Sequence, residues 1–523
     1  MVHVASLLRM NSQKINLKRI LLHPFLFGSY YIVAMLGSNI EQVKTLVALR
    51  PLFVVLLGSA ILLIVLRLIM KEWLRAAAAA TLLLVFFFSY GHIYHYLEEY
   101  FNPLGRHRLL IPIWGVFAGV SLYWITRRLR NLSEITVILN IISIVLLIFP
   151  LYQIASFKIR LLSVGQKPSE HLVTSSLTLP EEQTPDIYLI ILDEYTRADV
   201  LENVYKLDNT DFLQELASMD FNIIECSQSN YAQTELVLAS MLNLDYLDAL
   251  DERLSEDTAD HALLRGLIKD SIVEGTFREL GYNIVAFETG YYFSELEDAD
   301  VYFTPNQSLH QSLLGGMNAF EVMLFNNSAA LIISDATTLL QDFINTNHPH
   351  EIKRQQALYT LDMLARLPEE VSSPKFVFAH ILVTHEPFVF GADGEALDYP
   401  ENLDNAMYKK AYRDQIYFLN QQLLEVLNKI IANSGTPPVI IIQGDTGPGR
   451  VSNDYRMAIF SALYLPDNHD LSLPITLTPV NDFRLIFDQY YDGSLGLLED
   501  ISLFSLYTDS FNFKPIPNTC AGE

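Results

Sequence analysis

Hydrophobic residues along the chain follow one pattern before residue 155 and another after it. In the first part, five long apolar stretches each approach the roughly 20 residues that a helix needs to cross a bilayer. None of them contains an acidic residue, a lysine or an arginine. They cover residues 20–36, 51–66, 76–90, 109–126 and 135–151. One such run would also suit a buried helix of a soluble protein, but five in succession predict a membrane anchor over residues 1–155.

The basic residues between these stretches predict the orientation of the anchor. With the N-terminus in the cytoplasm, ten lysines and arginines lie on the cytoplasmic side and seven on the other, as the positive-inside rule favours. The ten are Arg9, Lys14, Lys18, Arg19, Arg67, Lys71, Arg75, Arg127, Arg128 and Arg130, and the seven are Lys44, Arg50, Arg106, Arg108, Lys158, Arg160 and Lys167. Five spans then predict an integral protein of the cytoplasmic membrane with an extracytoplasmic domain.

After the anchor, short apolar runs alternate with stretches of helical period. Residues 156–185 collect Lys, Ser, Thr, Pro and Glu without periodicity and predict a linker. Residues 186–523 predict an α/β domain with a mostly parallel sheet covered by helices on both faces. We expect strands at 187–192, 221–225, 282–287, 375–382, 438–443 and 457–465, and helices at 210–219, 234–244, 262–280, 319–343, 352–367, 405–432 and 479–490.

Charge and cysteine content narrow the function. The chain has 35 Lys and Arg against 60 Asp and Glu, although its first 165 residues are basic. A basic, apolar anchor joined to an acidic remainder is typical of a membrane-attached soluble domain. The acidity argues against nucleic acid as a partner, because phosphate backbones bind basic surfaces. Only Cys226 and Cys520 are present, so there is no disulfide framework; a single bridge between them is possible but has little to recommend it.

Two predicted strands end in acidic residues. The apolar run 187–192, typical of a strand buried on both faces, stops at Asp193 and Glu194. A second run, 438–443, leads to Asp445 and a Gly-Pro-Gly loop. Because ligands bind at the carboxyl ends of strands in such sheets, these acids predict a site for a hard cation. The alternatives are that Asp193 caps the next helix and that the glycine loop is a plain turn.

Thr234 and two histidines are further candidates for chemistry. Thr234 opens a helical pattern, where backbone N–H groups and the helix dipole suit an oxygen that attacks phosphate or sulfate. Capping the helix is the more ordinary role of such a threonine. His380 and His385 lie at or after the end of a predicted strand and could bind a metal or an anion. Burial with a backbone partner is the ordinary explanation for either histidine.

Taken together, residues 185–504 resemble the membrane-bound, sulfatase-like branch of the alkaline phosphatase superfamily, which includes lipoteichoic acid synthases and phosphoethanolamine transferases. Five spans before an outward-facing domain resemble the lipoteichoic acid synthase layout. The segments RMAIFSALYLP and ITLTPVNDFRLIFDQYY look like the family's closing strand and final helix.

The resemblance implies roles for particular residues. Asp193 matches the acidic metal ligand that ends the first strand, and Glu194 stands where true sulfatases have a second Asp. Thr234 matches the nucleophile that opens a helix. His385, with His380 upstream, matches the His-x-Pro-Phe element that contacts substrate or a second metal.

The sequence departs from the family pattern at two places. The formylglycine signature of sulfatases is missing at Thr234, and Cys226 lies eight residues too early to supply it. Asp445 and Thr446 match the first two residues of the family's Asp-His-Gly, but Thr446 stands where a metal-binding His is expected. A neutral hydroxyl is a poor substitute for imidazole.

We therefore expect a membrane-anchored, metal-dependent hydrolase or transferase that acts on phosphate, or sulfate, esters of lipid or glycan headgroups. The alternative is a catalytically impaired module with a binding or assembly role in the cell envelope. The cofactor would be a divalent ion, with Zn, Mn and Mg not distinguished. The expected site comprises Thr234 as nucleophile, Asp193, Asp445, Glu194 and Thr446 around the metal, and His385, His380 and Arg197 for the substrate.

Overall fold

The computed structural model of the chain contains two compact units. One comprises Met1–Ser156 and Gly315–His348, and the other comprises Phe157–Leu314 and Pro349–Glu523. The structure describes residues 20–41, 43–101, 107–164, 177, 184–251, 254, 261–305, 318–332, 349–397, 399, 403–466, 471–518 and 520.

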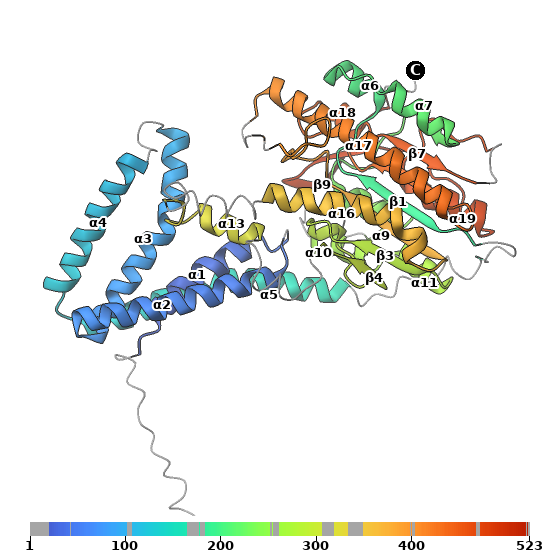
Figure 1. Cartoon of the computed structure of the whole chain (residues 1–523). Coiled ribbons are helices and arrows are strands. Elements are labelled where there is room, and N and C mark those ends of the chain that lie inside the picture. The colour runs from blue at the N-terminus through green and yellow to red at the C-terminus, as the bar shows by residue number, and fades with distance from the viewer. Residues whose placement is uncertain are drawn as a thin grey trace, which may run out of the picture. The chain divides into compact units, whose positions relative to one another are not determined.

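Each of the five apolar stretches forms a helix (Figure 1). Among the described residues, four helices are long and apolar enough to cross a membrane. The first expected span forms a shorter helix of 16 residues, α1. The helices are α1 (His23–Ser38), α2 (Leu49–Met70), α3 (Trp73–Tyr100), α4 (His107–Arg127) and α5 (Leu132–Val164), with a 3-10 turn, η2 (Thr45–Ala48), before α2.

The last of these helices extends into the predicted linker. α5 continues to Val164, past residue 156, because the intervening residues contain neither glycine nor proline to end it. Most of the rest of the predicted linker lies outside the described residues.

A segment from the predicted α/β domain belongs to the anchor unit instead. The helix α13 (Ala319–Asn326) packs against η2, and Arg50 at the start of α2 forms an ion pair with Glu321. Farther along, the backbone N–H of Ala329 donates to the carbonyl oxygen of Phe87 at 2.7 Å. Gly91 permits this approach, because a Cβ there would lie 2.2 Å from the Asn327 backbone. Residues 333–343 of the predicted helix lie outside the described residues.

The second unit contains a seven-stranded sheet in the order β2-β7-β6-β1-β5-β3-β4. The strands from β6 to β4 are parallel, and β7 is antiparallel to both β6 and β2. This confirms the expected mostly parallel sheet. The strands are β1 (Ile187–Leu192), β2 (Phe221–Ile223), β3 (Asn283–Phe287), β4 (Val301–Phe303), β5 (Lys375–Ile381), β6 (Val439–Gly444) and β7 (Ser461–Tyr464).

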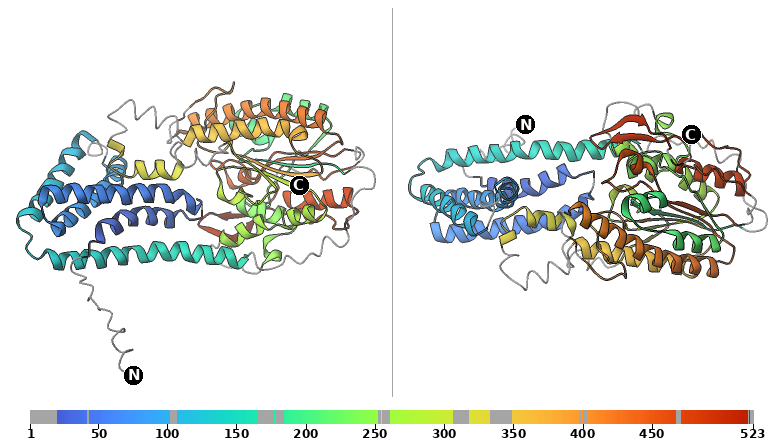
Figure 2. Two further views of the ribbon diagram at one scale, coloured as in Figure 1. Left: turned by 60° about the horizontal axis from the view of Figure 1, so that its bottom comes forward. Right: turned by 90° about the horizontal axis from the view of Figure 1, so that it is seen from above.

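Helices cover both faces of the sheet, and alternate residues of β1 are buried against different helices. Tyr188, Ile190 and Leu192 share one core with α16 (Pro349–Glu370) and α17 (Asn405–Asn433). These two helices lie side by side (Figure 2). Ile187, Leu189 and Ile191 share the other core with α8 (Thr234–Met241), α10 (His261–Lys269), α11 (Ile272–Glu279) and α19 (Asp482–Tyr490). The apolar run of β1 is therefore explained by burial on both sides.

Several element boundaries differ from the expected ones. The predicted helix 262–280 is broken into α10 and α11, because the Ser271 side chain accepts a hydrogen bond from Glu274 N and caps the second helix. The predicted strand 457–465 begins within a short helix, α18 (Asn453–Met457). The expected list lacked β4 and the hairpin of β8 (Leu503–Leu506) and β9 (Asp509–Pro515).

Cys226 and Cys520 form a disulfide with Cα atoms 5.4 Å apart, so the bridge that had little to recommend it from the sequence is present. Asn518 brings the end of the chain to this point by donating its side-chain N–H to the carbonyl oxygen of Cys226 at 2.7 Å. The proximity arises from tertiary folding across 294 positions, which spacing in the sequence does not reveal.

We predict that replacing both cysteines with serine destabilises the α/β domain by about 2–5 kcal/mol, because the bridge closes a long loop and restricts the unfolded chain. The measurement is denaturant unfolding of the full chain in detergent. Either single serine variant serves as the control and should lose as much stability as the double variant. Two reactive thiols in the oxidised, folded protein would contradict the bridge.

Candidate functional site

Asp193 and Asp445 directly follow two neighbouring strands at the centre of the sheet. Leu192 of β1 pairs with Gly444 of β6, so the next residue of each strand emerges at the same edge. The backbone N–H of Asp193 donates to the carbonyl oxygen of Ile381 at 3.0 Å, which ties Asp193 to β5 as well. Strand register therefore brings together two acids that are far apart in the sequence.

His380 joins them because of the two-residue period of a strand. Phe376 and Phe378 of β5 lie in the core shared with α8, and His380 continues this series to the same face. In the same way Asp193 continues the series that ends at Ile191. The period of the three central strands thus places these side chains on the face that α8 covers.

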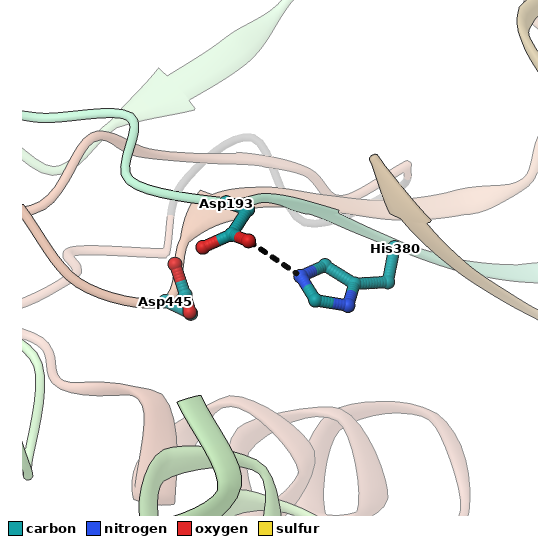
Figure 3. A group of neighbouring side chains, drawn as sticks. All are labelled: Asp193, His380 and Asp445. Atoms are coloured by element: carbon teal, nitrogen blue, oxygen red, sulfur yellow. Dashed lines mark ion pairs between the residues drawn. The ribbon is translucent and has the colours of Figure 1, made fainter. Parts of the chain in front are cut away.

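The three side chains form a compact cluster (Figure 3). One ligand atom each from Asp193, His380 and Asp445 lie within 4.8 Å of one another, and all three residues are buried. Asp193 Oδ2 is 3.8 Å from His380 Nε2. The cluster combines carboxylate oxygens with an imidazole nitrogen, a donor set that zinc and other transition metals accept.

Thr234 reaches the cluster through Asp445. Its Oγ1 donates a hydrogen bond to Asp445 Oδ2 at 2.5 Å, and it is the first residue of α8. The other carboxylate oxygen of Asp445 accepts from the backbone N–H of Glu194 at 2.9 Å and of Thr446 at 2.7 Å. Asp445 is therefore held by two backbone groups while it receives the threonine hydroxyl.

Three polar atoms here are buried without a hydrogen-bond partner in the described part of the chain. They are Asp193 Oδ1, His380 Nε2 and Thr446 Oγ1. Leaving a polar group buried and unpaired costs about 1–3 kcal/mol each. A bound cation would satisfy the oxygen of Asp193 and the nitrogen of His380, so these residues fit a metal ion.

Burial and nearby charge shift the ionisation of the cluster. The pKa of Asp193 lies well above its ordinary value, because the carboxyl is buried and because Asp445 and Glu194 add negative charge. Burial lowers the pKa of His380 to about 4, so the imidazole is neutral at pH 7 and keeps a lone pair for a metal. A divalent cation would favour the ionised form of Asp193.

The ring of His380 is held from its far side. Ser294 Oγ lies 2.8 Å from His380 Nδ1, and the ring of Tyr291 packs edge-on with centroids 6.1 Å apart. A partner on one ring nitrogen fixes the orientation of the other, which here faces Asp193.

Glu194 is close to the cluster but bonds to a basic residue. Its φ of 60° is unusual for a residue other than glycine, and such strain is concentrated at functional sites. Glu194 Oε1 accepts from Arg456 Nη1 at 2.6 Å. Arg456 Nε also donates to the carbonyl oxygen of Ala232 at 3.2 Å, in the loop before Thr234. Arg456 was not among the predicted site residues, although it begins the segment likened to the family's closing strand.

The other predicted site residues lie in different surroundings. Thr446 is fully buried, whereas His385 is exposed on the loop after β5. Arg197 donates to both oxygens of Asp199, at 2.7 and 2.9 Å, and to the carbonyl oxygen of Ser227 at 3.1 Å. None of these contacts joins Arg197 to the cluster, and its role in binding substrate stays a prediction.

Lys353 supplies a positive charge that the sequence did not suggest. It lies on α16, and its Nζ donates to the carbonyl oxygens of Pro387, at 2.9 Å, and of His385. With His380 it lines a small cavity. Burial lowers the pKa of Lys353 to about 8, although Asp193 and Glu194 oppose this shift. Only the fold brings this lysine of a helix close to the strand ends.

No protein-family model matches the chain, and no curated protein matches it. Among solved structures, the chain is similar to the C-terminal periplasmic domain of EcEptC from Escherichia coli, in complex with Zn, at 12% identity over 65% of this chain and 94% of that one, with a TM-score of 0.42. It is also similar to the integral membrane protein lipooligosaccharide phosphoethanolamine transferase A from Neisseria meningitidis, at 12% identity over 86% and 88% of the chains, with a TM-score of 0.37. A 2-O GAG sulfatase matches at 13% identity over 64% and 76%, with a TM-score of 0.39.

Proposed function

We propose that the chain is a membrane-anchored enzyme that transfers or hydrolyses phosphate, or sulfate, esters of lipid or glycan headgroups, with Thr234 as its nucleophile. The hydrogen bond of 2.5 Å from Thr234 Oγ1 to Asp445 Oδ2 carries this proposal. It places a hydroxyl at a helix N-terminus against a carboxylate that also belongs to a cluster of candidate metal ligands. A threonine that only caps its helix would bond to backbone N–H groups instead.

Asp193, Asp445 and His380 would hold a divalent cation. When bound, such an ion lowers the pKa of a nearby hydroxyl and neutralises charge on the transferred group. A mixture of oxygen and nitrogen ligands favours Zn or Mn over Mg. His380 then supplies the imidazole that Thr446 cannot, and the predicted metal-ligand roles of Thr446 and Glu194 are secondary to it.

The reaction begins with attack by Thr234. Its oxygen forms a bond to phosphorus while the bond from phosphorus to the ester oxygen breaks, and Asp445 receives the hydroxyl proton along the existing hydrogen bond. The departing ester oxygen takes up a proton, for which exposed His385 is the candidate donor. An acceptor hydroxyl or water then attacks the phosphothreonine and gives its proton to His385, while the bond from phosphorus to Thr234 breaks and the threonine oxygen takes its proton back from Asp445. This completes transfer or hydrolysis.

An acidic domain needs local positive charge to bind an anionic substrate. The positive charges of Arg456 and Lys353 both lower the pKa of Asp193, so each lies close enough to influence the cluster. The N-terminus of α8 adds the positive end of its dipole. These groups support binding of phosphate or sulfate despite the formal net charge of −25.

The disulfide and the anchor support an extracytoplasmic domain. Disulfides persist in oxidising compartments outside the cytoplasm, which suits Cys226 and Cys520. The helix α13 follows β4 in the sequence, and the ion pair of its Glu321 with Arg50 holds it at the N-terminal end of α2. In the predicted topology this end faces away from the cytoplasm, as the domain does.

A second candidate is the catalytically impaired module in the cell envelope. The observation that favours it is Arg456, whose guanidinium already pairs with Glu194 and offsets negative charge near the cluster. A fixed guanidinium could replace a metal in stabilising the fold but cannot activate Thr234 as a cation does. Absence of turnover in the native chain, on both phosphodiesters and sulfate esters, would favour this function.

We predict that Thr234→Ala lowers turnover of a generic phosphodiester or sulfate ester at least about a thousandfold, because the covalent step loses its nucleophile. Thr234→Ser should retain measurable activity, since it keeps a hydroxyl. The matched control is Thr210→Ala, which alters the first residue of α7 (Thr210–Ser218) on the surface and should act as wild type. Equal activity of Thr234→Ala and wild type would remove Thr234 as nucleophile.

We predict that kcat/KM for an anionic substrate falls as pH rises through about 8, because Lys353 loses its proton and its positive charge there. Lys353→Met should lower kcat/KM roughly tenfold at pH 7, as expected for loss of one charged interaction. The same variant should lack this fall above pH 8, and Lys353→Arg should move it to higher pH. An unchanged alkaline limb in Lys353→Met would assign the titration to another group.

A further inference from the structure

A groove of about 260 Å³ lies between α1 and α3 of the anchor unit. Its lining residues recur at intervals of three or four along each helix and so share one face. Among them are Phe27 and Tyr31 on α1, and Leu84, Val85, Ser89 and His92 on α3. Val85 is 44% exposed, so the groove is open at its side and not an internal void.

The groove changes from apolar to polar along its length. Phe27 on α1 and Leu84 on α3 mark the apolar part. Tyr31 and His92, one and two turns farther along the same helices, mark the polar end. The groove therefore has apolar side chains at one end and polar side chains at the other, which matches a molecule with a hydrocarbon part and a polar head.

A network of hydrogen bonds closes the polar end. Tyr31 OH donates to the carbonyl oxygen of Asn327 at 2.9 Å, and its oxygen lies 2.6 Å from His92 Nε2. Nearby, His95 Nε2 donates to the carbonyl oxygen of Asn326 at 3.2 Å. The partners Asn326 and Asn327 end α13, the segment that follows the first strands of the α/β domain.

Two polar side chains of the groove, Ser89 and Tyr31, already have hydrogen-bond partners. Ser89 Oγ donates to the carbonyl oxygen of Val85 at 2.5 Å, and Tyr31 OH is used by Asn327. Water needs two to four polar partners to be held in place, and the groove is lined mainly by apolar side chains. Because α3 is long and apolar enough to cross a bilayer, the available occupant beside it is hydrocarbon.

We propose that this groove binds one acyl chain of a membrane phospholipid, with the lipid head at the Tyr31–His92 end. The inference rests on the proposed function for the identity of that lipid, which would be the one whose headgroup ester is the substrate. Under the predicted topology the polar end faces away from the cytoplasm, so the lipid belongs to the outer leaflet.

Photolabelling of the full chain tests this groove. The protein is placed in nanodiscs that contain a phospholipid with a diazirine in one acyl chain, and the labelled peptides are identified by mass spectrometry. We expect the peptides that contain Phe27 and Leu84 to be labelled in excess over the exposed surface of α2. Leu84→Trp should fill the groove and reduce labelling there to the level of α2. The matched control Leu57→Trp, on the exposed face of α2, should leave it unchanged.

Two results would overturn the proposal. Uniform labelling of α1, α2 and α3 would mean that only bulk lipid contacts these helices. If Leu84→Trp is labelled as strongly as wild type and has the same thermal midpoint, the acyl chain does not occupy this groove. If Leu84→Trp does not fold, Ser89→Phe narrows the same groove and is held to the same outcomes.

The readout also separates this proposal from the proposed function, because labelling needs no turnover. Thr234→Ala should be labelled like wild type. If labelling is selective and Thr234→Ala is fully active, Thr234 is not the nucleophile but the groove still binds lipid. If turnover depends on Thr234 but labelling is not selective, the groove does not bind lipid and Thr234 is still the nucleophile.

Discussion

Repulsion between two buried carboxylates governs the site. Asp193 and Asp445 lie at the ends of adjacent strands, nearly removed from water, and their charges oppose each other. Ionised groups in such surroundings are stable only with a proton, a counter-ion or several hydrogen bonds. Asp445 has three donors, whereas Asp193 retains an unpaired oxygen. The imbalance makes Asp193 the position where the protein needs a cation most.

Regular structure maintains this costly arrangement. The apolar strands β1, β5 and β6 are buried on both faces and pair in a fixed register, so their ends cannot separate without loss of the core. A rigid sheet can hold groups that would otherwise repel one another. The helix α8 adds Thr234 to the same face, and Arg456 ties the loop before it to Glu194.

Sequence patterns predicted the parts of this structure that depend on local periodicity. Uninterrupted apolar runs identified β1 and β6, and the polar residues after them identified Asp193 and Asp445 as neighbours. The same two-residue period could have separated His380, which lies on the face of α8, from His385, which lies on an exposed loop. Lys353, Arg456 and the disulfide escaped prediction because only tertiary packing brings them to their partners. The placement of α13 with the anchor escaped it for the same reason, since its ion pair joins Arg50 to Glu321.

The most direct test of this account is to locate a metal ion by anomalous diffraction from crystals of the protein grown with zinc or manganese. We expect one strong peak about 2.0–2.2 Å from a carboxylate oxygen of Asp193, one of Asp445 and Nε2 of His380. Absence of a peak at saturating metal, or a peak confined to His385 and other exposed side chains, would contradict it. In that case the buried acids would have to be stabilised by protons and by Arg456 alone.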